Sequence, residues 1–396
     1  MDDRLKCLVC GLEFSFVPNQ IFCHGCGQPG LFQSSVVNNA GIKSTGTTAL
    51  ERFASFLPLG QVRPELSLGE GQTPLLALNK LDSSGCLLAK LESSNPTLSF
   101  KDRGSALVVQ KALELGWSAV GTVSTGNMAS STAAYAARAG LKCILLVKKG
   151  TSAAALLSSA IFHPLILEVG GDYGQLFRES YGLGQEFGIY FANSVDPVRL
   201  EGYKLTAFEL CLQLGRAPDY VYVPVSSGGH FVGLYKGFIE LGQAGYIEKV
   251  PVMVGVQAAG CAPIASAFEA GQNSVSQIQP SETIAHSIAN PDPPAGNLVL
   301  KMVNDYDGFL TSVTDEDMLL AQKQLARDEG LFVQPESASA LAAYFKLRHR
   351  FVGTSVLVLT GQGLKASHQP GIDNLTYQVS GVGELKEFFR SVYSQK

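Results

Sequence analysis

Short apolar runs alternate with longer segments of helical composition along most of the chain. Three runs rich in valine, residues 119–123, 220–225 and 355–359, have the length and β-branched composition of buried strands. Segments with strong helix formers, such as residues 128–140 and 231–242, stand between runs of this kind. This alternation predicts an α/β fold in which helices cover open, twisted, mostly parallel sheets.

Small polar residues follow each of the three strands, where parallel strands present their carboxyl ends. The sequence reads Ser-Thr-Gly-Asn at 124–127, Ser-Ser-Gly-Gly-His at 226–230 and Thr-Gly at 360–361. Glycines and amides at the start of a helix bind carboxylates and phosphates, so these turns predict a ligand site at one sheet edge. Each turn taken alone is also an ordinary helix cap or loop. Neither GxxxxGK[ST] nor GxGxxG occurs, which excludes the usual nucleotide loops.

A lysine, Lys101, follows a fourth polar loop at residues 91–100. A lysine at the mouth of a partly dry cleft has a lowered pKa, which lets its amine attack an aldehyde and later act as a base. The alternative for Lys101 is the surface position that most lysines occupy. It becomes a candidate catalytic residue only in company with the other three loops.

Four of the eight cysteines crowd the first 26 residues, in two CxxC pairs that are each followed by glycine. Four thiolates brought together in this way match tetrahedral zinc, and about 30 residues could hardly fold without such a staple. Two disulfides or an iron–sulfur site are the alternatives. We predict a structural zinc ribbon with the ligands Cys7, Cys10, Cys23 and Cys26. The other four cysteines lie among apolar neighbours and are expected to be buried.

Composition bounds the size of the protein and its partners. The chain has 396 residues, of which 46% are hydrophobic and 16% charged, so it fills two or three domains and is not disordered. Its 30 Lys and Arg residues against 34 Asp and Glu give no basic face for nucleic acid. No apolar stretch reaches the roughly 18 to 20 residues of a membrane helix, and the N-terminus is acidic where a signal peptide is basic. We therefore expect a cytoplasmic protein that binds neither nucleic acid nor membranes.

Together these segments resemble threonine synthase of the pyridoxal phosphate (PLP) fold type II family. NPTLSFKDRG at 95–104, STGN at 124–127, a glycine loop after VPV at 223–225 and LTGQG at 359–363 stand in the order of that family. The resemblance extends over nearly the whole chain, and some members of the family carry a zinc ribbon. It implies two α/β domains of the tryptophan synthase β type after the ribbon, and a homodimer. The implied reaction is γ-elimination of phosphate from O-phosphohomoserine, followed by addition of water at Cβ to give threonine.

The resemblance also implies a role for each site residue. Lys101 would hold PLP as a Schiff base and move protons, Asn127 would bond the ring hydroxyl, and Thr360 would face the pyridine nitrogen. The loop that holds the cofactor phosphate through backbone amides would be Ser226, Ser227, Gly228, Gly229 and His230. The α-carboxylate of the substrate would lie at Ser124, Thr125 and Gly126. The phosphate of the substrate would lie at Asn193, Ser194 and Arg199.

Several positions depart from the pattern of the family, and they cluster around the substrate. His230 stands where the phosphate loop commonly ends in asparagine, Tyr203 replaces a glutamine, and Met128 replaces a threonine. Asp172 and Gln362 are further departures. The alternatives are therefore β-replacement on O-phosphoserine with sulfite, as in cysteate synthase, and a threonine or serine dehydratase. A non-catalytic zinc-ribbon binding protein and, for Arg199, a surface ion pair with Glu201 are the structural alternatives.

The expected domain division follows from the same motifs. The ribbon would comprise residues 1–33 and a polar linker residues 34–49. Residues 50–103 and 206–396 would form the large PLP domain. Residues 104–205 would form a small mobile domain that closes over the substrate and expels water.

Overall fold

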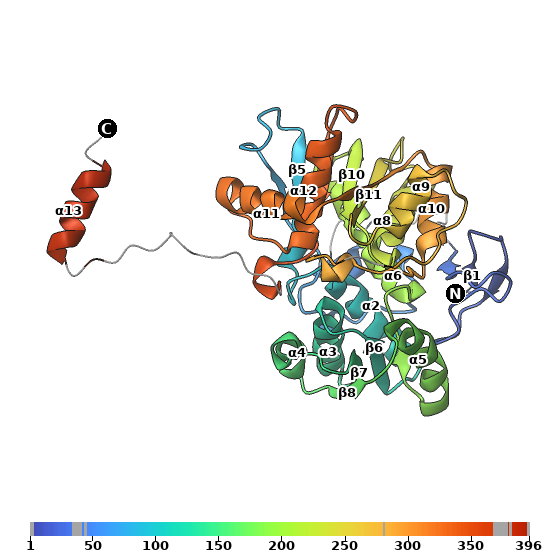
Figure 1. Ribbon diagram of the computed structural model, residues 1–396. Helices are drawn as coiled ribbons and strands as arrows, with labels where there is room; N and C mark the ends of the chain where they lie inside the picture. Colours follow the sequence, from blue (N-terminus) through green and yellow to red (C-terminus); the bar gives the residue numbers. More distant parts are fainter. Residues whose placement is uncertain are drawn as a thin grey trace. The chain divides into compact units, whose positions relative to one another are not determined.

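The computed structural model describes residues 4–33, 42, 46–279, 282–366, 379 and 382–393. Most of the predicted linker lies outside this set. So do the other residues after 366, which belong to the predicted large domain. Contacts divide the chain into two units, residues 1–365 and residues 366–396. The described helix of the second unit is α13 (Val382–Tyr393), on which Leu385 and Phe388 are the half-buried apolar side chains. Figure 1 shows both units.

The N-terminal ribbon is a small antiparallel sheet. Its strands are β1 (Arg4–Lys6), β2 (Glu13–Ser15) and β3 (Leu31–Phe32), and β1 lies between the other two. Gly11 and Gly27, with φ of 80° and 71°, turn the chain after each CxxC pair. The apolar side chains of the ribbon belong to the same core cluster as those of the following sheets, so the ribbon packs onto the body of the protein.

A six-stranded sheet forms the centre of the larger part. Its strand order is β12-β11-β10-β13-β5-β4, and all neighbours are parallel except β4, which is antiparallel to β5. The strands are β4 (Leu75–Ala77), β5 (Leu87–Lys90), β10 (Tyr220–Pro224), β11 (Val252–Ala258), β12 (Phe309–Val313) and β13 (Ser355–Val358). The central strands are buried except at the first residues of β10 and β11, as expected of strands that helices cover on both faces.

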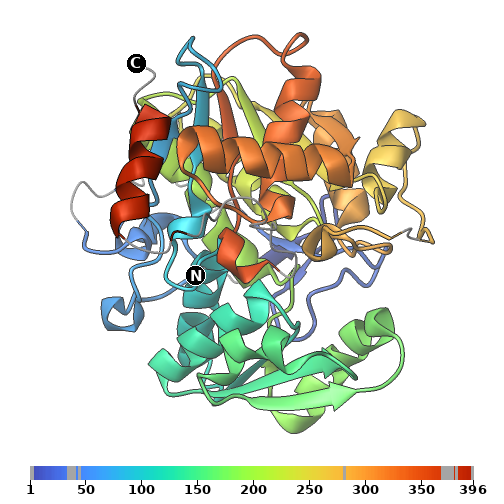
Figure 2. The ribbon, with the colours of Figure 1, turned by 60° about the vertical axis from the view of Figure 1, so that its left-hand side comes forward.

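A second, wholly parallel sheet has the strand order β8-β7-β6-β9. Its strands are β6 (Ala119–Val123), β7 (Lys142–Lys148), β8 (Leu165–Val169) and β9 (Tyr190–Phe191). The helices that connect them are α3 (Asn127–Ala139), α4 (Ala153–Ala160) and α5 (Tyr173–Phe187). Figures 1 and 2 show this sheet, in teal and green, below the larger one. The predicted α/β fold with two sheets is confirmed, whereas the predicted domain boundaries stay a prediction.

The other α-helices of the first unit stand before, between and after the strands of the two sheets along the chain. They are α1 (Ala49–Arg52), α2 (Lys101–Glu114), α6 (Pro197–Tyr203), α7 (Leu205–Leu214), α8 (Gly229–Gln243), α9 (Pro263–Glu269), α10 (Gly296–Asp305), α11 (Asp315–Glu329) and α12 (Pro335–Leu347). Within the described ranges no helix has both the length and the apolar character needed to cross a membrane.

Helices α2 and α6 cross in unusually close contact because glycines stand at the crossing. A Cβ at Gly202 would collide with the carbonyl oxygen of Arg103, and one at Gly104 would collide with the side chain of Arg199. Since α2 begins at Lys101, this crossing fixes the position of Lys101 relative to α6.

A buried network of charges ties β5 and α2 to α7. Arg103 donates from Nε to Glu92 Oε2 and from Nη1 to Glu209 Oε1, both at 2.7 Å. Lys90 Nζ lies 2.8 Å from Glu209 Oε2. Burial raises the pKa of Glu209, but the cations of Arg103 and Lys90 outweigh it and bring this pKa to about 2. The carboxylate therefore stays ionised inside the protein.

The predicted elements agree with the structure except at their ends. The run 119–123 is β6 without any change, but β10 ends at Pro224 and β13 at Val358, each one residue earlier than predicted. Helix α8 begins at Gly229, so the last two residues of the predicted loop 226–230 form its first turn. The cause is Gly228, whose φ of 92° breaks the strand direction and starts the helix.

Candidate active site

The loop after β10 contacts the segment that ends in Lys101. The imidazole of His230 stacks on the ring of Phe100, with 3.7 Å between centroids and 20° between planes. The amide of Phe100 in turn donates to the carbonyl oxygen of Thr360, the residue after Leu359, at 3.1 Å. The loops that follow β5, β10 and β13 therefore meet at Lys101, as their place at the carboxyl ends of parallel strands predicts.

The loop after β6 joins the same site through Gln334, which precedes α12. Asn127 Nδ2 donates to Gln334 Oε1 at 2.8 Å, and the amide of Gln334 donates to the carbonyl oxygen of Gly361 at 3.0 Å. Asn127 thus lies close to the residue after Thr360. The structure brings together all four strand-end segments that the sequence singles out.

Lys101 has an unusual environment for an amine. Its Nζ lies 4.4 Å from the ring centroid of Phe100 and 5.7 Å from that of Tyr203. Among the described residues this amine has no hydrogen-bond or ion-pair partner. Burial, with a further contribution from the positive charge of Arg199, lowers the pKa of Lys101 to about 7. The amine is therefore available as a neutral nucleophile near neutral pH.

His230 is a neutral imidazole at the start of α8. Its side chain is buried, and neither ring nitrogen finds a hydrogen-bond partner in the part of the chain that the structure describes. Burial, followed by the charges of Lys101 and Arg103, holds the pKa of His230 well below its ordinary value. The ring of Tyr203 packs edge-on against the imidazole, with 5.5 Å between the two centroids. Two of the departures noted in the sequence, at 203 and 230, are thus neighbours.

The loop 226–230 has the features of a phosphate cradle. The first amides of a helix have no carbonyl within the helix to bond, so those at the start of α8 are open to a ligand. The loop is held from its other side, because Asn290 Nδ2 donates to Ser227 Oγ at 2.9 Å and the amide of Ala295 donates to Ser227 O at 3.1 Å. With the loop anchored in this way, the amides of its glycines are fixed in direction.

Thr360 presents a neutral hydroxyl in a fixed position. Its Oγ1 lies 2.8 Å from Ser337 Oγ, and Ser337 Oγ also accepts from the amide of Gly361 at 2.8 Å. Sequence reasoning missed both Gln334 and Ser337. The available signal was the Gln-Pro pair at 334–335, since proline is favoured in the first turn of a helix.

The residues predicted to bind the substrate fall into two groups. Ser124, Thr125 and Gly126 form the loop before α3, in which the side chains of Ser124 and Thr125 are half-buried and Gly126 is exposed. Asn193, by contrast, is buried: its Oδ1 accepts from the amide of Val123 at 2.9 Å and its Nδ2 donates to Ser180 Oγ at 2.9 Å. Ser194 is partly buried beside it.

Arg199 is buried and bonded to the protein on most sides. Its guanidinium donates to the carbonyl oxygen of Ala192 at 2.8 and 3.1 Å, to Ser105 Oγ at 2.9 Å and to Thr132 Oγ1 at 3.1 Å. This arrangement is not the surface pair with Glu201 that was the alternative. A contact of Asn193, Ser194 and Arg199 with a substrate phosphate stays a prediction.

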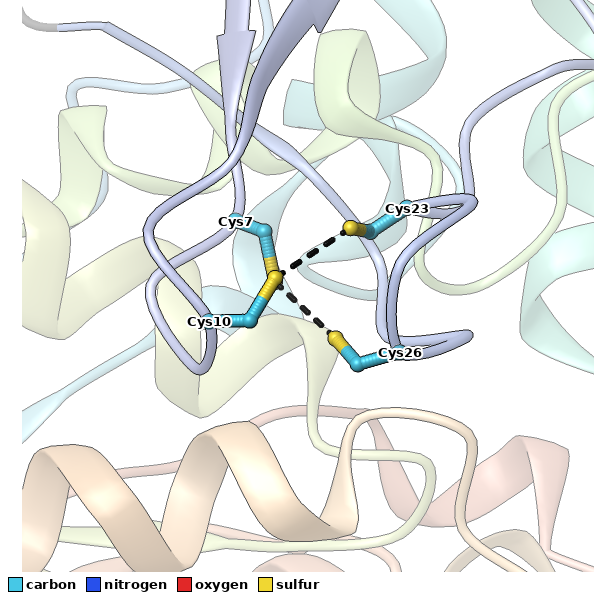
Figure 3. A group of neighbouring side chains, drawn as sticks. All are labelled: Cys7, Cys10, Cys23 and Cys26. Atoms are coloured by element: carbon cyan, nitrogen blue, oxygen red, sulfur yellow. Dashed lines mark hydrogen bonds between the residues drawn. The ribbon is translucent and has the colours of Figure 1, made fainter.

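The four N-terminal cysteines converge as predicted. All their sulfur atoms lie within 4.8 Å of one another, and the Cys7–Cys26 and Cys10–Cys23 sulfurs are 3.4 Å apart (Figure 3). Zinc–sulfur bonds of about 2.3 Å in a tetrahedron place sulfurs roughly 3.8 Å apart, so the cluster fits a zinc ion. The other cysteines agree with the prediction except for Cys86, which is only half-buried, before β5; the buried ones are Cys143, Cys211 and Cys261.

Comparison with known proteins agrees with this geometry. Residues 66–361 match the family described as pyridoxal-phosphate dependent enzyme. Threonine synthase of Methanocaldococcus jannaschii is 40% identical over 323 residues, which cover 79% of this chain and 80% of that protein. Threonine synthase of Methanosarcina acetivorans is 35% identical over 376 residues, which cover 91% and 92%.

Solved structures share the fold. A threonine deaminase from tomato (Solanum lycopersicum) superposes with a TM-score of 0.64 at 19% identity, over 75% of this chain and 80% of the other. Maize serine racemase superposes with a TM-score of 0.63 at 18% identity, over 87% and 96%. At these identities the similarity concerns the arrangement of helices and strands alone, and it does not indicate which substrate this chain binds.

Proposed function

Since the chain belongs to the threonine synthase family of pyridoxal-phosphate-dependent enzymes, we propose that it eliminates phosphate from O-phosphohomoserine and adds water to give threonine. The observation that carries this proposal is identity to threonine synthases over most of the chain, together with a half-buried lysine, unpaired among the described residues, where the family attaches its cofactor. The reaction class is that of a PLP-dependent carbon–oxygen lyase.

The residues around Lys101 fit PLP. The Lys101 amine would bind the aldehyde carbon, the open amides at the start of α8 would hold the phosphate, and the hydroxyl of Thr360 would face the ring nitrogen. Asn127 would bond the ring hydroxyl. Bound PLP withdraws electrons from the α carbon of an amino acid. A neutral hydroxyl at position 360 protonates the ring nitrogen less firmly than a carboxylate would, which suits elimination better than transamination.

Lys101 has the properties of the proton carrier. Its pKa of about 7 lets the amine take a proton from the α carbon and return it near neutral pH. The amine lies over the rings of Phe100 and Tyr203, at 4.4 and 5.7 Å from their centroids, and has no hydrogen-bond partner among the described residues. The same amine would take the β proton before phosphate leaves from the γ carbon.

The loop before α3 would hold the substrate carboxylate. Amides at the start of a 13-residue helix and the hydroxyls of Ser124 and Thr125 favour an anion there. Because this loop follows a strand of the smaller sheet, movement of residues 104–205 toward the larger sheet would enclose the substrate and exclude water.

Further properties of the protein belong to the same proposal. Cys7, Cys10, Cys23 and Cys26 would hold a structural zinc ion, for which their sulfur distances are suitable. The protein would work as a homodimer in the cytoplasm.

Attachment of PLP to the apoprotein is expected to accelerate as pH rises toward about 7 and to level off above it. Lys101 has a pKa of about 7, so a rate that depends on the neutral amine falls about tenfold for each pH unit below that value. Stopped-flow recording of the visible absorbance against pH measures this rate. A rate that kept rising well above pH 7, as an ordinary lysine requires, would contradict the assignment.

A product assay tests the function directly. The protein is given O-phosphohomoserine or O-phosphoserine, each with and without sulfite, and phosphate release and amino-acid products are measured. We expect one threonine for each phosphate released from O-phosphohomoserine. Turnover of O-phosphoserine alone, with sulfite incorporated, would replace the proposal by the β-replacement alternative.

A further inference from the structure

One buried side chain of the ribbon, Asn19, contacts the four-stranded sheet. It lies in the turn 17–20 between the two CxxC pairs, where the amide of Gln20 donates to Val17 O at 2.9 Å. Pro18 precedes Asn19, and the φ of Asn19 is 67°. This is the pattern of a type II turn, in which asparagine can adopt the left-handed conformation. Asn19 is 5% exposed, unlike its neighbours Val17 and Gln20.

The side-chain amide of Asn19 pairs with the outer edge of β9. Its Nδ2 donates to Ile189 O at 3.0 Å, and its Oδ1 accepts from the amide of Phe191 at 2.9 Å. β9 is the edge strand of its sheet, so one side chain satisfies two backbone groups that a further strand would otherwise bond. Gly184 provides the space, because a Cβ there would lie 2.7 Å from Asn19 Nδ2.

The chain that leaves β9 supports the site on its substrate side. The carbonyl oxygen of Ala192 accepts two hydrogen bonds from the guanidinium of Arg199. The side chain of Asn193 bonds the amide of Val123, the last residue before the loop 124–126. A shift of β9 would therefore move both the arginine and the loop proposed to hold the carboxylate.

The same segment also supports the phosphate cradle. A Cβ at Gly229 would collide with the carbonyl oxygen of Ser194, so the first turn of α8 rests directly on the residue that follows Asn193. Arg199, the loop 124–126 and the first turn of α8 thus all depend on the position of the residues that follow β9. Asn19 bonds the free edge of that strand.

The position of Asn19 depends in turn on the ribbon. The strands of the ribbon have only two or three residues each, and four cysteine sulfurs gather at its centre. Small ribbons of this kind depend on a metal for their fold, so we expect a zinc ion at these sulfurs to hold the turn that carries Asn19. Figure 1 shows the ribbon, in blue, with one end turned toward α5, and Phe22 packs edge-on against Tyr181 of that helix at 5.4 Å.

We propose that Asn19 is a positioning residue that links the folding of the cysteine ribbon to the loops around Lys101. The ribbon then acts on substrate binding without touching the substrate. The kinetic part of this inference rests on the proposed function, whereas the pairing of Asn19 with β9 does not.

Asn19→Ala in the full-length, PLP-loaded protein tests the link. We expect hydrogen exchange at the amide of Phe191 to accelerate at least about tenfold, since its acceptor is lost. We also expect KM for O-phosphohomoserine to rise about tenfold, while kcat stays within about threefold, because binding loops shift and Lys101 does not. Gln20→Ala, at the exposed neighbour, is the matched control and should change neither quantity.

Asn19→Asp separates the two hydrogen bonds. It keeps the acceptor for the Phe191 amide but sets a carboxylate oxygen against Ile189 O in place of the donor, so KM should rise at least as much as in Asn19→Ala. Exchange at the Phe191 amide should nevertheless stay slower than in Asn19→Ala, because its acceptor is kept. Exchange as fast as in the alanine variant would overturn the pairing as the cause.

Removing the metal with a chelator completes a thermodynamic cycle. In the native protein we expect the same faster exchange and higher KM as in Asn19→Ala, and in Asn19→Ala we expect less than about twofold further change. Independent, additive effects would overturn the inference, because the ribbon would then act by another route.

The two proposals can fail separately. If no threonine forms but Asn19→Ala accelerates exchange at β9 and alters the visible absorbance of bound PLP, the proposed function is wrong and the link stands. If threonine forms and Asn19→Ala leaves exchange and KM unchanged, the link is wrong and the function stands.

Discussion

Lys101→Ala is expected to abolish the visible absorbance of the lysine-bound cofactor and to lower threonine formation at least about 10³-fold. The reason is that this side chain would supply both the attachment point and the proton carrier, and among the described residues its amine alone lies over the rings of Phe100 and Tyr203. Absorbance spectra and a threonine assay on the purified variant measure both losses.

Lys365→Met is the matched control for that experiment. Lys365 also has a pKa that burial lowers, to about 8, but its Nζ donates to Thr97 O at 2.8 Å and is not free. The control should keep the visible absorbance. A Lys101→Ala protein that kept its colour and activity would reject Lys101 as the attachment point, and a control that also lost its colour would show that the loss is not specific to Lys101.

Glu209→Gln is expected to lower the free energy of unfolding by about 3–5 kcal/mol. The change leaves the buried cations of Arg103 and Lys90 without the carboxylate that both contact, and an uncompensated buried charge has a cost of this size. Urea unfolding followed by circular dichroism gives the value. Asp292→Asn, which breaks the exposed pair with Arg178, should change little, and equal effects of the two variants would contradict this account.

The pH dependence of stability provides a second test of Glu209. Its folded pKa of about 2 lies below the ordinary value of 4.5, so its contribution is fully present above about pH 4.5 and is lost as pH falls toward 2. The native protein should therefore approach the stability of Glu209→Gln in acid, and a constant difference across that range would contradict the pKa.

The sequence predicts the parts of the site that a single strand and turn define. Lys101 follows a polar loop and Thr360 follows a β-branched strand, and both segments have a clear end in the sequence. Asn127 begins a helix that is predicted from its many alanines. Parallel strands then bring these residues together without any further information. The recognition of a known family adds the identity of the cofactor, which no local pattern supplies.

Contacts between distant residues are the part that the sequence does not predict. Asn127 and Gln334 are 207 positions apart, and Asn19 and Phe191 are 172 apart, so neither pair leaves a local pattern. The burial of Arg199 is hidden for the same reason, since its acceptors come from separate elements. Element ends shift by one or two residues where Gly228 starts a helix earlier than the loop composition suggests.

The crossing of α2 and α6 has a consequence for how the enzyme can tolerate change. At Gly202 the two backbones touch with nothing between them, so the helices cannot slide past each other at this point. Helix α2 begins at Lys101, only two residues before Arg103, whose carbonyl oxygen faces Gly202. A methyl group added at position 202 would press on that oxygen and displace the start of α2, and with it the amine of Lys101.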